Sequence, residues 1–164
     1  MELPKNEHPE FVGLEALKAK QAAQLAVFEE WALNKDWHHF HASHYDWWMF
    51  PYSQPSQFGF AYVVYASETE ALKQDSLFIR NYLRGVELLF LSWGWDLQNE
   101  VEVPEPAHDQ KWHNWPIRLH KCAMSLQEFG FVREFDSVRK YARMLIRQGV
   151  SFEYNGRDLS ALFI

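Results

Sequence analysis

Apolar residues recur at three- and four-residue steps over much of the chain, which predicts a helical protein. From residue 10 to about 34, Leu14, Leu17 and Phe28 fall on one helical face. Because this apolar stripe is narrow, we expect the first helix to pack with one side only. Residues 1–9 hold two prolines among charged residues and show no apolar period, so we expect a loose N-terminal arm.

Four further helices follow the same pattern, and they span about 67–74, 77–93, 115–129 and 134–148. The helix over 77–93 carries the widest apolar stripe, so we expect it to be the most buried. Gly85 lies in its middle at a cost of about 1 kcal/mol relative to Ala, and close approach of another helix is one reason for such a glycine. Gly94 is a natural stop for this helix.

The segment 36–50 is the most unusual part of the chain, because it holds four of the eight histidines and runs into a block of aromatic residues. Asp36 is placed to cap a short helix. Pro51 closes the segment, since the residue before a proline avoids helical geometry. We therefore expect one short helix whose first half carries imidazoles and whose second half carries large rings.

These elements predict an all-α fold, a single compact domain over residues 1–164 with about five to six helices and long aromatic-rich loops at 52–65 and 98–113. A chain of this length buries roughly two thirds of its unfolded surface, so it needs no disulfide or metal to fold. The apolar tail from residue 150 onward is expected to dock on the body.

The net charge of −6 disfavours binding to a phosphate backbone, so nucleic acid is an unlikely partner. The charge is uneven, however. Residues 111–148 contain eight Lys or Arg and three Asp or Glu. This basic stretch is either a helix surface set beside an acidic half of the molecule or an anion-binding face.

The single cysteine, Cys122, cannot form a disulfide within the chain, which fits a reducing compartment. Residues 1–10 lack the apolar core of a signal peptide, and no stretch of 18 apolar residues occurs. We therefore expect a soluble, cytoplasmic protein without a membrane span.

The histidines suggest a metal site as one hypothesis. His38 and His41, and again His41 and His44, are three positions apart, which on a helix places them near one face. Asp46, or His113 with Asp109, could complete a site for zinc, copper or iron, and the chain would then be a metal-dependent hydrolase or oxidoreductase. The paired cysteines of structural zinc and the His-Glu-x-x-His motif are missing. The alternative is that these histidines cap, hydrogen-bond and pack, so that no cofactor is bound.

Other catalytic patterns are weak. Cys122 falls in the middle of a predicted helix, where a buried inert thiol is expected, whereas reactive thiolates favour accessible, electropositive sites. No Gly-x-Ser-x-Gly elbow and no glycine-rich phosphate loop occurs. The sequence therefore leans away from an enzyme.

Aromatic density is the best indication of binding. Eleven aromatic residues lie between residues 37 and 65, and aromatic residues make up 17% of the whole chain. Rings with a few polar tips line peptide and small-molecule pockets, although a thick aromatic core would use the same residues. Trp93, Trp95, Trp112 and Trp115 could approach the rings of this segment from two later loops.

The candidate binding site combines nine residues: His41, His44, Asp46, Trp47, Trp48, Arg84, Trp95, His113 and Arg118. Arg84 and Arg118 would anchor an anion or a carboxylate, and the rings would supply contact area. The expected function is that of a non-enzymatic binding or interaction domain, with a peptide, protein, small molecule or small anion as its ligand. Oligomerisation through an exposed aromatic surface is a third hypothesis.

Several short motifs occur in a recognisable order. Residues 44–51 read His-Tyr-Asp-Trp-Trp-Met-Phe-Pro, and residues 81–89 read Asn-Tyr-Leu-Arg-Gly-Val-Glu-Leu-Leu before a Gly-Trp-Asp-Leu at 94–97. Further along, Arg-Leu at 118–119 precedes Ser-Leu-Gln-Glu-Phe-Gly at 125–130. Over about residues 40–145 this order resembles the opioid growth factor receptor conserved region.

That resemblance implies a helical domain without known catalysis. Animal members of the family are linked to enkephalin-type peptide binding and growth control, a role that does not carry over to a short chain without their long repetitive tail. The family's His-Asn pair also falls one residue out of register with His113-Asn114.

Overall fold

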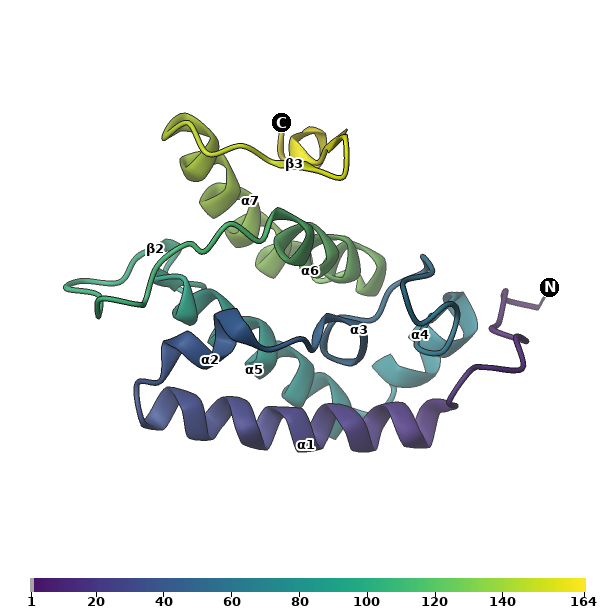
Figure 1. Cartoon of the computed structure of the whole chain (residues 1–164). Helices are drawn as coiled ribbons and strands as arrows, with labels where there is room; N and C mark the ends of the chain where they lie inside the picture. The colour runs from purple at the N-terminus through teal and green to yellow at the C-terminus, as the bar shows by residue number, and fades with distance from the viewer. Residues whose placement is uncertain (1) are drawn as a thin grey trace.

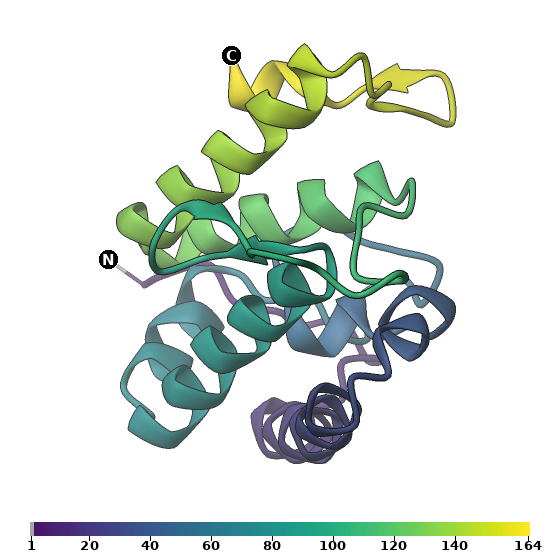
Figure 2. The ribbon, with the colours of Figure 1, turned by 90° about the vertical axis from the view of Figure 1, so that its left-hand side faces the viewer.

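The computed structural model describes residues 2–164, and its helices are arranged around α5 (Figures 1 and 2). The α-helices are α1 (Leu14–Leu33), α2 (Trp37–Ala42), α3 (Asp46–Met49), α4 (Ala66–Lys73), α5 (Ser76–Ser92), α6 (Pro116–Phe129) and α7 (Val132–Arg147). Two short antiparallel hairpins pair β1 (Trp95–Asp96) with β2 (Val101–Glu102) and β3 (Glu153–Tyr154) with β4 (Arg157–Asp158). A 3-10 turn, η1 (Ser160–Phe163), ends the chain. The predicted all-α fold is confirmed.

Helix α5 is the central element, as its wide apolar stripe predicts. Its first turn is capped by the Asp75 carboxylate, which accepts a hydrogen bond from the Phe78 N–H at 3.0 Å. Along its length α5 packs against α1. At Gly85 a β-carbon would come within 2.6 Å of Met49 Cε, so the glycine admits the end of α3 against the helix backbone. This close approach explains the unfavourable glycine in the middle of the helix.

The short helices α2 and α3 form a middle layer. In Figure 1 they lie between α1 below and α6 above, with α7 and the C-terminal tail on the far side of α6. Figure 2 looks along α1 and shows the same order of layers from a second direction. The sequence predicts one helix over residues 36–50, whereas the structure has two, α2 and α3.

The break between α2 and α3 has a physical cause in the backbone. Ser43 is extended, with φ −100° and ψ 162°, and the chain resumes helical geometry only at Asp46. The Tyr45 hydroxyl donates to the Phe40 carbonyl at 2.6 Å and stabilises this bend. Apolar periodicity does not depend on such a side-chain contact. The sequence pattern therefore continues across residues 43–45 and does not predict the break.

Residues 2–9 differ from the expected loose arm, because they are tied to the body. The Asn6 side chain donates from Nδ2 to the carbonyls of Phe60 and Val63, both at 2.9 Å. Its backbone N–H donates to Glu68 Oε1 at 2.9 Å, and the Ser67 N–H donates to the Pro4 carbonyl. These are polar anchors, which an analysis of apolar periodicity does not detect.

The C-terminal tail docks as expected. Phe152, Leu159 and Phe163 are buried and belong to the same core as the helices. The predicted loop at 98–113 contains β2, whose two residues are too few to leave a period in the sequence. Among residues 2–164, no helix has the length and apolar character that crossing a membrane requires.

Candidate functional site

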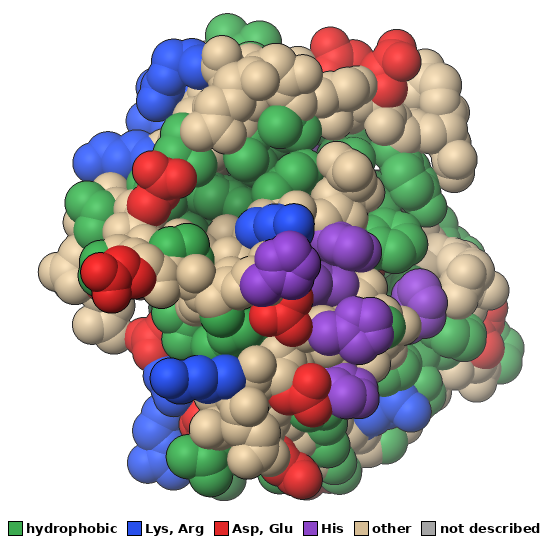
Figure 3. Space-filling view, turned by 60° about the vertical axis from the view of Figure 1, so that its left-hand side comes forward, with side chains coloured by type: hydrophobic (Ala, Val, Ile, Leu, Met, Phe, Trp, Pro, Cys, Tyr) green, Lys and Arg blue, Asp and Glu red, His purple; other side chains and the backbone are tan. Residues whose placement is uncertain are grey.

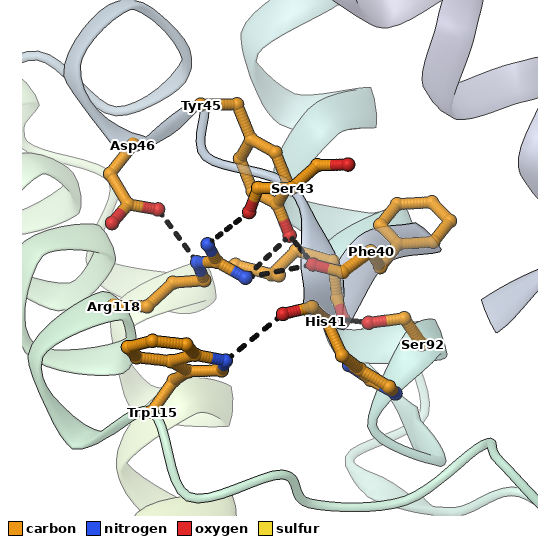
Figure 4. Close-up of polar contacts among 9 residues, drawn as sticks. Phe40, His41, Ser43, Tyr45, Asp46, Ser92, Trp115 and Arg118 are labelled. Carbon is orange, nitrogen blue, oxygen red and sulfur yellow. Dashed lines mark hydrogen bonds and ion pairs between the residues drawn. The ribbon is translucent and has the colours of Figure 1, made fainter. Parts of the chain in front are cut away.

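Arg118 is the most heavily bonded of the predicted site residues (Figure 4). It leaves α6 and points into the bend between α2 and α3, where its Nε donates to Asp46 Oδ1 at 2.8 Å. Its Nη1 donates to the Phe40 carbonyl at 2.8 Å and to the Tyr45 hydroxyl at 3.1 Å. Its Nη2 donates to the Ser43 carbonyl at 2.6 Å.

This network is a structural clamp. Only 1% of the Arg118 side chain and 8% of the Asp46 side chain are exposed, and a buried charge is tolerated only when it is paired and hydrogen-bonded. The guanidinium also lies 4.3 Å from the centre of the Tyr45 ring, and burial raises the pKa of that phenol. Because its donors are engaged inside the protein, Arg118 has little left to offer a ligand.

Two other predicted residues lie in different surroundings. Arg84 forms a two-pronged ion pair with Glu29 of α1, with its Nε and Nη2 at 3.0 and 2.9 Å from the carboxylate, and it also pairs with Glu87. Trp95 is buried, and its indole N–H donates to Ser137 Oγ at 3.1 Å. Both side chains therefore hold helices and loops together, away from the histidine segment.

Histidine side chains gather on one face of the molecule (Figure 3). His41 is only 4% exposed, its Nε2 lies 2.8 Å from the Asp109 carbonyl, and its ring stacks on His113 with 4.9 Å between centroids. The His38 N–H donates to Asp109 Oδ2, and the Trp115 indole donates to the His41 carbonyl, both at 3.1 Å. These contacts attach the loop after β2 to α2.

Burial lowers the pKa of His41 below its usual 6.5. Positive charge on His113 and Arg118 acts in the same direction, whereas the hydrogen bond to the Asp109 carbonyl opposes it. The His41 Nδ1 atom is buried and has no hydrogen-bond partner within residues 2–164. Neutral His41 therefore suits this site, and a proton added at Nδ1 would find no acceptor.

The histidines do not converge. Helix α2 ends at Ala42, so the three-residue spacing places only His38 and His41 on one helix, and His44 lies beyond it. His38 and His44 are exposed, whereas His41 points inward. In the part of the chain that the structure describes, no three His, Cys, Asp or Glu side chains are grouped as a metal site requires.

Asp46 and Trp47 line a narrow cleft together with Tyr52 and Lys121. Its volume of about 10 Å³ is room for roughly one water molecule. Lys121 Nζ lies 5.0 Å from the centre of the Trp47 ring, and burial lowers the pKa of this amine. The cleft is too small for a peptide side chain.

Trp48 lies on the other side of α3. Its indole N–H donates to Gln24 Oε1 at 3.2 Å, and Lys20 Nζ lies 4.4 Å from the centre of its ring. These partners both belong to α1. The structure thus brings together six of the predicted residues around the α2–α3 bend: His41, His44, Asp46, Trp47, His113 and Arg118. The Trp48 ring lies 5.8 Å from that of Trp47 but faces α1, whereas Arg84 and Trp95 lie elsewhere.

A ring-lined hollow lies beside this histidine face, between α7 and the loop after β2. We call it the aromatic groove, and it is lined by Trp93, Gly94, Glu102, Val103, Pro106, Gln110, Lys111, Trp112, Tyr141, Met144, Leu145 and Gln148. Its volume is about 400 Å³, which falls in the range of ligand sites. Hydrophobic side chains line a hollow next to the histidines in Figure 3.

Three rings form the floor of the aromatic groove. Trp93 and Trp112 meet edge to face with 5.0 Å between centroids, and Tyr141 lies parallel to Trp93 at 6.1 Å. The Tyr141 hydroxyl donates to the Trp93 carbonyl at 3.3 Å, and burial raises its pKa. The three rings therefore pack against one another, and Trp93 and Tyr141 are each only 2% exposed.

The polar side chains of the aromatic groove divide into engaged and unpaired groups. Gln110 is engaged, since its Nε2 donates to the Leu91 carbonyl at 2.9 Å and its Oε1 accepts from the Ala107 N–H at 3.1 Å. The indole N–H groups of Trp93 and Trp112 are buried without an acceptor anywhere in residues 2–164. A buried donor without a partner costs about 1–3 kcal/mol.

Sequence reasoning found this groove only in part. The sequence predicts that Trp93 and Trp112 approach the histidine segment, and it does not single out Tyr141 as a groove residue. Only the density of tryptophan at residues 93–95 and 112–115 could have indicated a ring-lined surface there.

Three of the five basic side chains of α7 are engaged by other groups of the protein. Arg139 contacts Asp136 at 3.6 Å, and Lys140 contacts Glu100 at 3.2 Å. Arg143 donates from Nε to the Phe163 carbonyl at 2.6 Å and thereby holds the C-terminal turn. This arrangement favours the interpretation of a solvated helix surface over that of an anion-binding face.

Comparison with protein-family models, with curated proteins and with solved structures yields no match. The resemblance to the opioid growth factor receptor conserved region therefore remains a prediction from the motifs. A fold alone does not determine function, so the evidence for function lies in the site itself.

Proposed function

We propose that this chain is a non-catalytic binding domain that holds a peptide segment of another protein in the aromatic groove. One observation carries the proposal: the groove offers about 400 Å³, and the partly exposed Trp112 ring lines it beside the buried rings of Trp93 and Tyr141. Aromatic walls with a few polar groups are typical of peptide and small-molecule sites. The cleft at Asp46 and Trp47, at about 10 Å³, has no such capacity.

The surroundings of the groove support binding over catalysis. The Cys122 thiol is buried, and that burial raises its pKa well above the usual value. His41 contacts a backbone carbonyl and another histidine. The family resemblance, which implies a helical domain without known catalysis, points the same way.

The histidine face fits this proposal as a support for the groove. Asp109 is held by α2, and the next residues, Gln110, Lys111 and Trp112, line the groove. The predicted residues around the α2–α3 bend would thus position one wall without touching the ligand. A single cysteine, with no disulfide possible within the chain, supports the cytoplasm as the proposed location.

A library of random peptides displayed on phage, selected on the immobilised chain, tests the proposal. The groove is blocked by Met144→Arg, which adds bulk and charge to its α7 wall. The matched control is Val132→Arg, which makes a similar change at an exposed position of the same helix outside the groove. Both variants are first checked for wild-type circular dichroism and melting temperature.

We expect related sequences to be enriched on the wild-type chain and on Val132→Arg and to be lost on Met144→Arg. If no sequence is enriched on the wild-type chain, or if the enriched peptides bind Met144→Arg equally well, the proposed function is wrong.

A further inference from the structure

The contact between α2 and the loop after β2, residues 103–115, is built around one buried imidazole. We infer that protonation of His41 detaches this loop from α2 at acidic pH and thereby loosens one wall of the aromatic groove. Such a pH-dependent contact lies beyond the proposed function, because the loop would respond whether or not a peptide binds. Three features lead to it: the tautomer of His41, the charges that face it and the weak attachment of the loop.

The hydrogen bond of His41 sets its tautomer. Its Nε2 lies 2.8 Å from the Asp109 carbonyl, and a carbonyl only accepts, so Nε2 carries the proton of the neutral ring. A second proton must therefore occupy Nδ1. That atom is buried and has no hydrogen-bond partner within residues 2–164. Because a buried charged group without a partner is costly, protonation favours any arrangement that exposes Nδ1 to water.

Positive charge beside His41 also opposes a second proton. The His113 ring of the loop stacks on it with 4.9 Å between centroids and 13° between planes, so a charge on one ring repels a charge on the other. Arg118 of α6 donates to the carbonyl of Phe40, the residue before His41. Asp109 acts in the opposite direction, although its carboxylate already accepts from a backbone N–H of α2 at 3.1 Å. Burial first, and then the two positive groups, keep the pKa of His41 below 6.5.

Two other helices pack against α2. Helix α1 meets it through the rings of Phe28 and Trp31. The end of α5, residues 88–92, contains no charged residue. On α2 itself, His39 pairs with Asp36 at 2.8 Å. The proton balance at the buried imidazole is therefore set by the loop and by α6.

The loop is the more weakly held side of this contact. Of residues 103–115, Gln110 alone is buried, whereas α2 buries two large rings, Trp37 and Phe40, in the core. Segments with few buried apolar contacts open locally before the core does. Within residues 2–164, two of the three hydrogen bonds between the loop and α2 involve His41. Release of His41 therefore removes most of this attachment.

The groove would respond because the loop supplies part of its lining. Gln110, Lys111 and Trp112 follow directly after Asp109, whose carbonyl and carboxylate are both held by α2. The hydrogen bond from Gln110 to the Leu91 carbonyl does not involve α2 and stays in place. The wall is therefore expected to loosen while it remains tethered to the end of α5.

The direction of the pH effect follows from the lowered pKa. With the loop in place the pKa of His41 lies below 6.5, and in water it returns to about 6.5. The closed arrangement therefore keeps its full stability above pH 6.5 and loses it as the pH falls towards the closed-state pKa. At about pH 5.5, one unit below the value in water, the opening equilibrium should rise by roughly threefold to tenfold.

Exchange of indole N–H groups with water, followed by NMR at about pH 7.5 and 5.5, tests this movement. The reporter is Trp115, whose indole N–H donates to the His41 carbonyl. The reference is Trp95, whose indole N–H donates to Ser137 in a buried contact away from the loop. Because both groups are indoles, the intrinsic effect of pH on exchange cancels in the ratio of their rates. The His41 ring signals are titrated in the same samples.

Two variants isolate the imidazole. His41→Gln keeps an N–H donor for the Asp109 carbonyl and removes the titration. His38→Gln is the matched control, because it removes an exposed imidazole from the same helix and leaves the backbone N–H of residue 38 bonded to Asp109. We expect the ratio of the Trp115 rate to the Trp95 rate to rise by roughly threefold to tenfold at the lower pH in the wild type and in His38→Gln. It should stay constant in His41→Gln.

Either of two results would overturn the inference. A constant ratio in the wild type means that the loop stays on α2 at acidic pH, whether or not the His41 ring takes up a proton. An equal rise in His41→Gln means that another group controls the loop. If His41→Gln does not fold, the wild-type titration decides, since the ratio must then rise over the same pH range in which the His41 signals move. No ligand enters the measurement, so its failure would leave the proposed function untouched.

Discussion

Arg118 on α6 and Asp46 at the start of α3 form a buried ion pair, with 2.8 Å between Nε and Oδ1. The two residues are 72 positions apart in the chain. Their pairing, together with the bonds from Arg118 to the carbonyls of Phe40 and Ser43, fastens the bend between α2 and α3 to α6. The positive charge of Arg118, which the sequence predicts to anchor a ligand, thus holds α2 and α3 in place.

Replacing Arg118 with methionine should destabilise the chain by about 3–5 kcal/mol, because it leaves the Asp46 carboxylate buried without its partner. Urea unfolding followed by circular dichroism measures the change. The control is Arg139→Met, which removes an exposed pair with Asp136 and should cost less than about 0.5 kcal/mol. Equal losses for the two variants would show that the clamp does not stabilise the fold.

The second prediction concerns Asn6, which ties the N-terminal segment to the body. Asn6→Ala removes the two hydrogen bonds from Nδ2 and leaves the buried Val63 carbonyl without this donor, so the free energy of unfolding should fall by about 1–3 kcal/mol. Lys5→Ala is the neighbouring control, since its 3.8 Å contact with Glu7 is exposed. If the urea midpoint of Asn6→Ala equals that of Lys5→Ala, residues 2–9 do not stabilise the body.

Stability should fall as the pH drops below about 6.5. Burial lowers the folded-state pKa of both His41 and His120 below the usual 6.5. The unfolded chain therefore binds more protons in this range, and the stability present above pH 6.5 is lost as the pH falls towards the folded-state values. Urea midpoints at about pH 7.5, 6.5 and 5.5 measure the slope.

The variants His41→Gln and His120→Gln should each flatten this pH dependence, and the double variant should flatten it further. Glutamine at position 41 keeps an N–H donor for the Asp109 carbonyl while removing the titration. If the urea midpoint of both single variants changes with pH as steeply as that of the wild type, other groups cause the pH dependence.

Cys122 should not react with a thiol reagent in the native chain. The side chain is completely buried, and burial raises the pKa of its thiol, so both access and thiolate are lacking. We expect labelling by 5,5′-dithiobis(2-nitrobenzoic acid) to occur only in urea, at the rate of unfolding. Rapid stoichiometric labelling without urea would contradict the described burial.

Much of the helical fold follows from local patterns. The helix predicted over 77–93 is α5, 76–92, and the one predicted over 115–129 is α6, 116–129, because apolar stripes, caps and glycine stops act within a few residues. The break at Ser43–Tyr45 and the docking of residues 2–9 depend on hydrogen bonds to distant segments. Periodicity cannot report those contacts.

In the candidate site, too, some features follow from local sequence and others from contacts between distant segments. Several of the candidate residues are neighbours around the α2–α3 bend. The roles of Arg84, Trp95 and Arg118, however, depend on partners that no spacing reveals. The aromatic groove combines rings from the end of α5, the loop after β2 and α7. It arises only when those three segments pack together.

The sequence by itself determined where most of the helices form and that they bury an aromatic-rich core, because these properties depend on local residue types. Tertiary structure alone decided which charges pair, which imidazoles point inward and where a hollow remains. Those outcomes depend on distances between side chains far apart in the chain, such as Arg118 from Asp46 and Trp93 from Trp112. The proposed binding site is accordingly the aromatic groove. The histidine segment supports one wall of that groove.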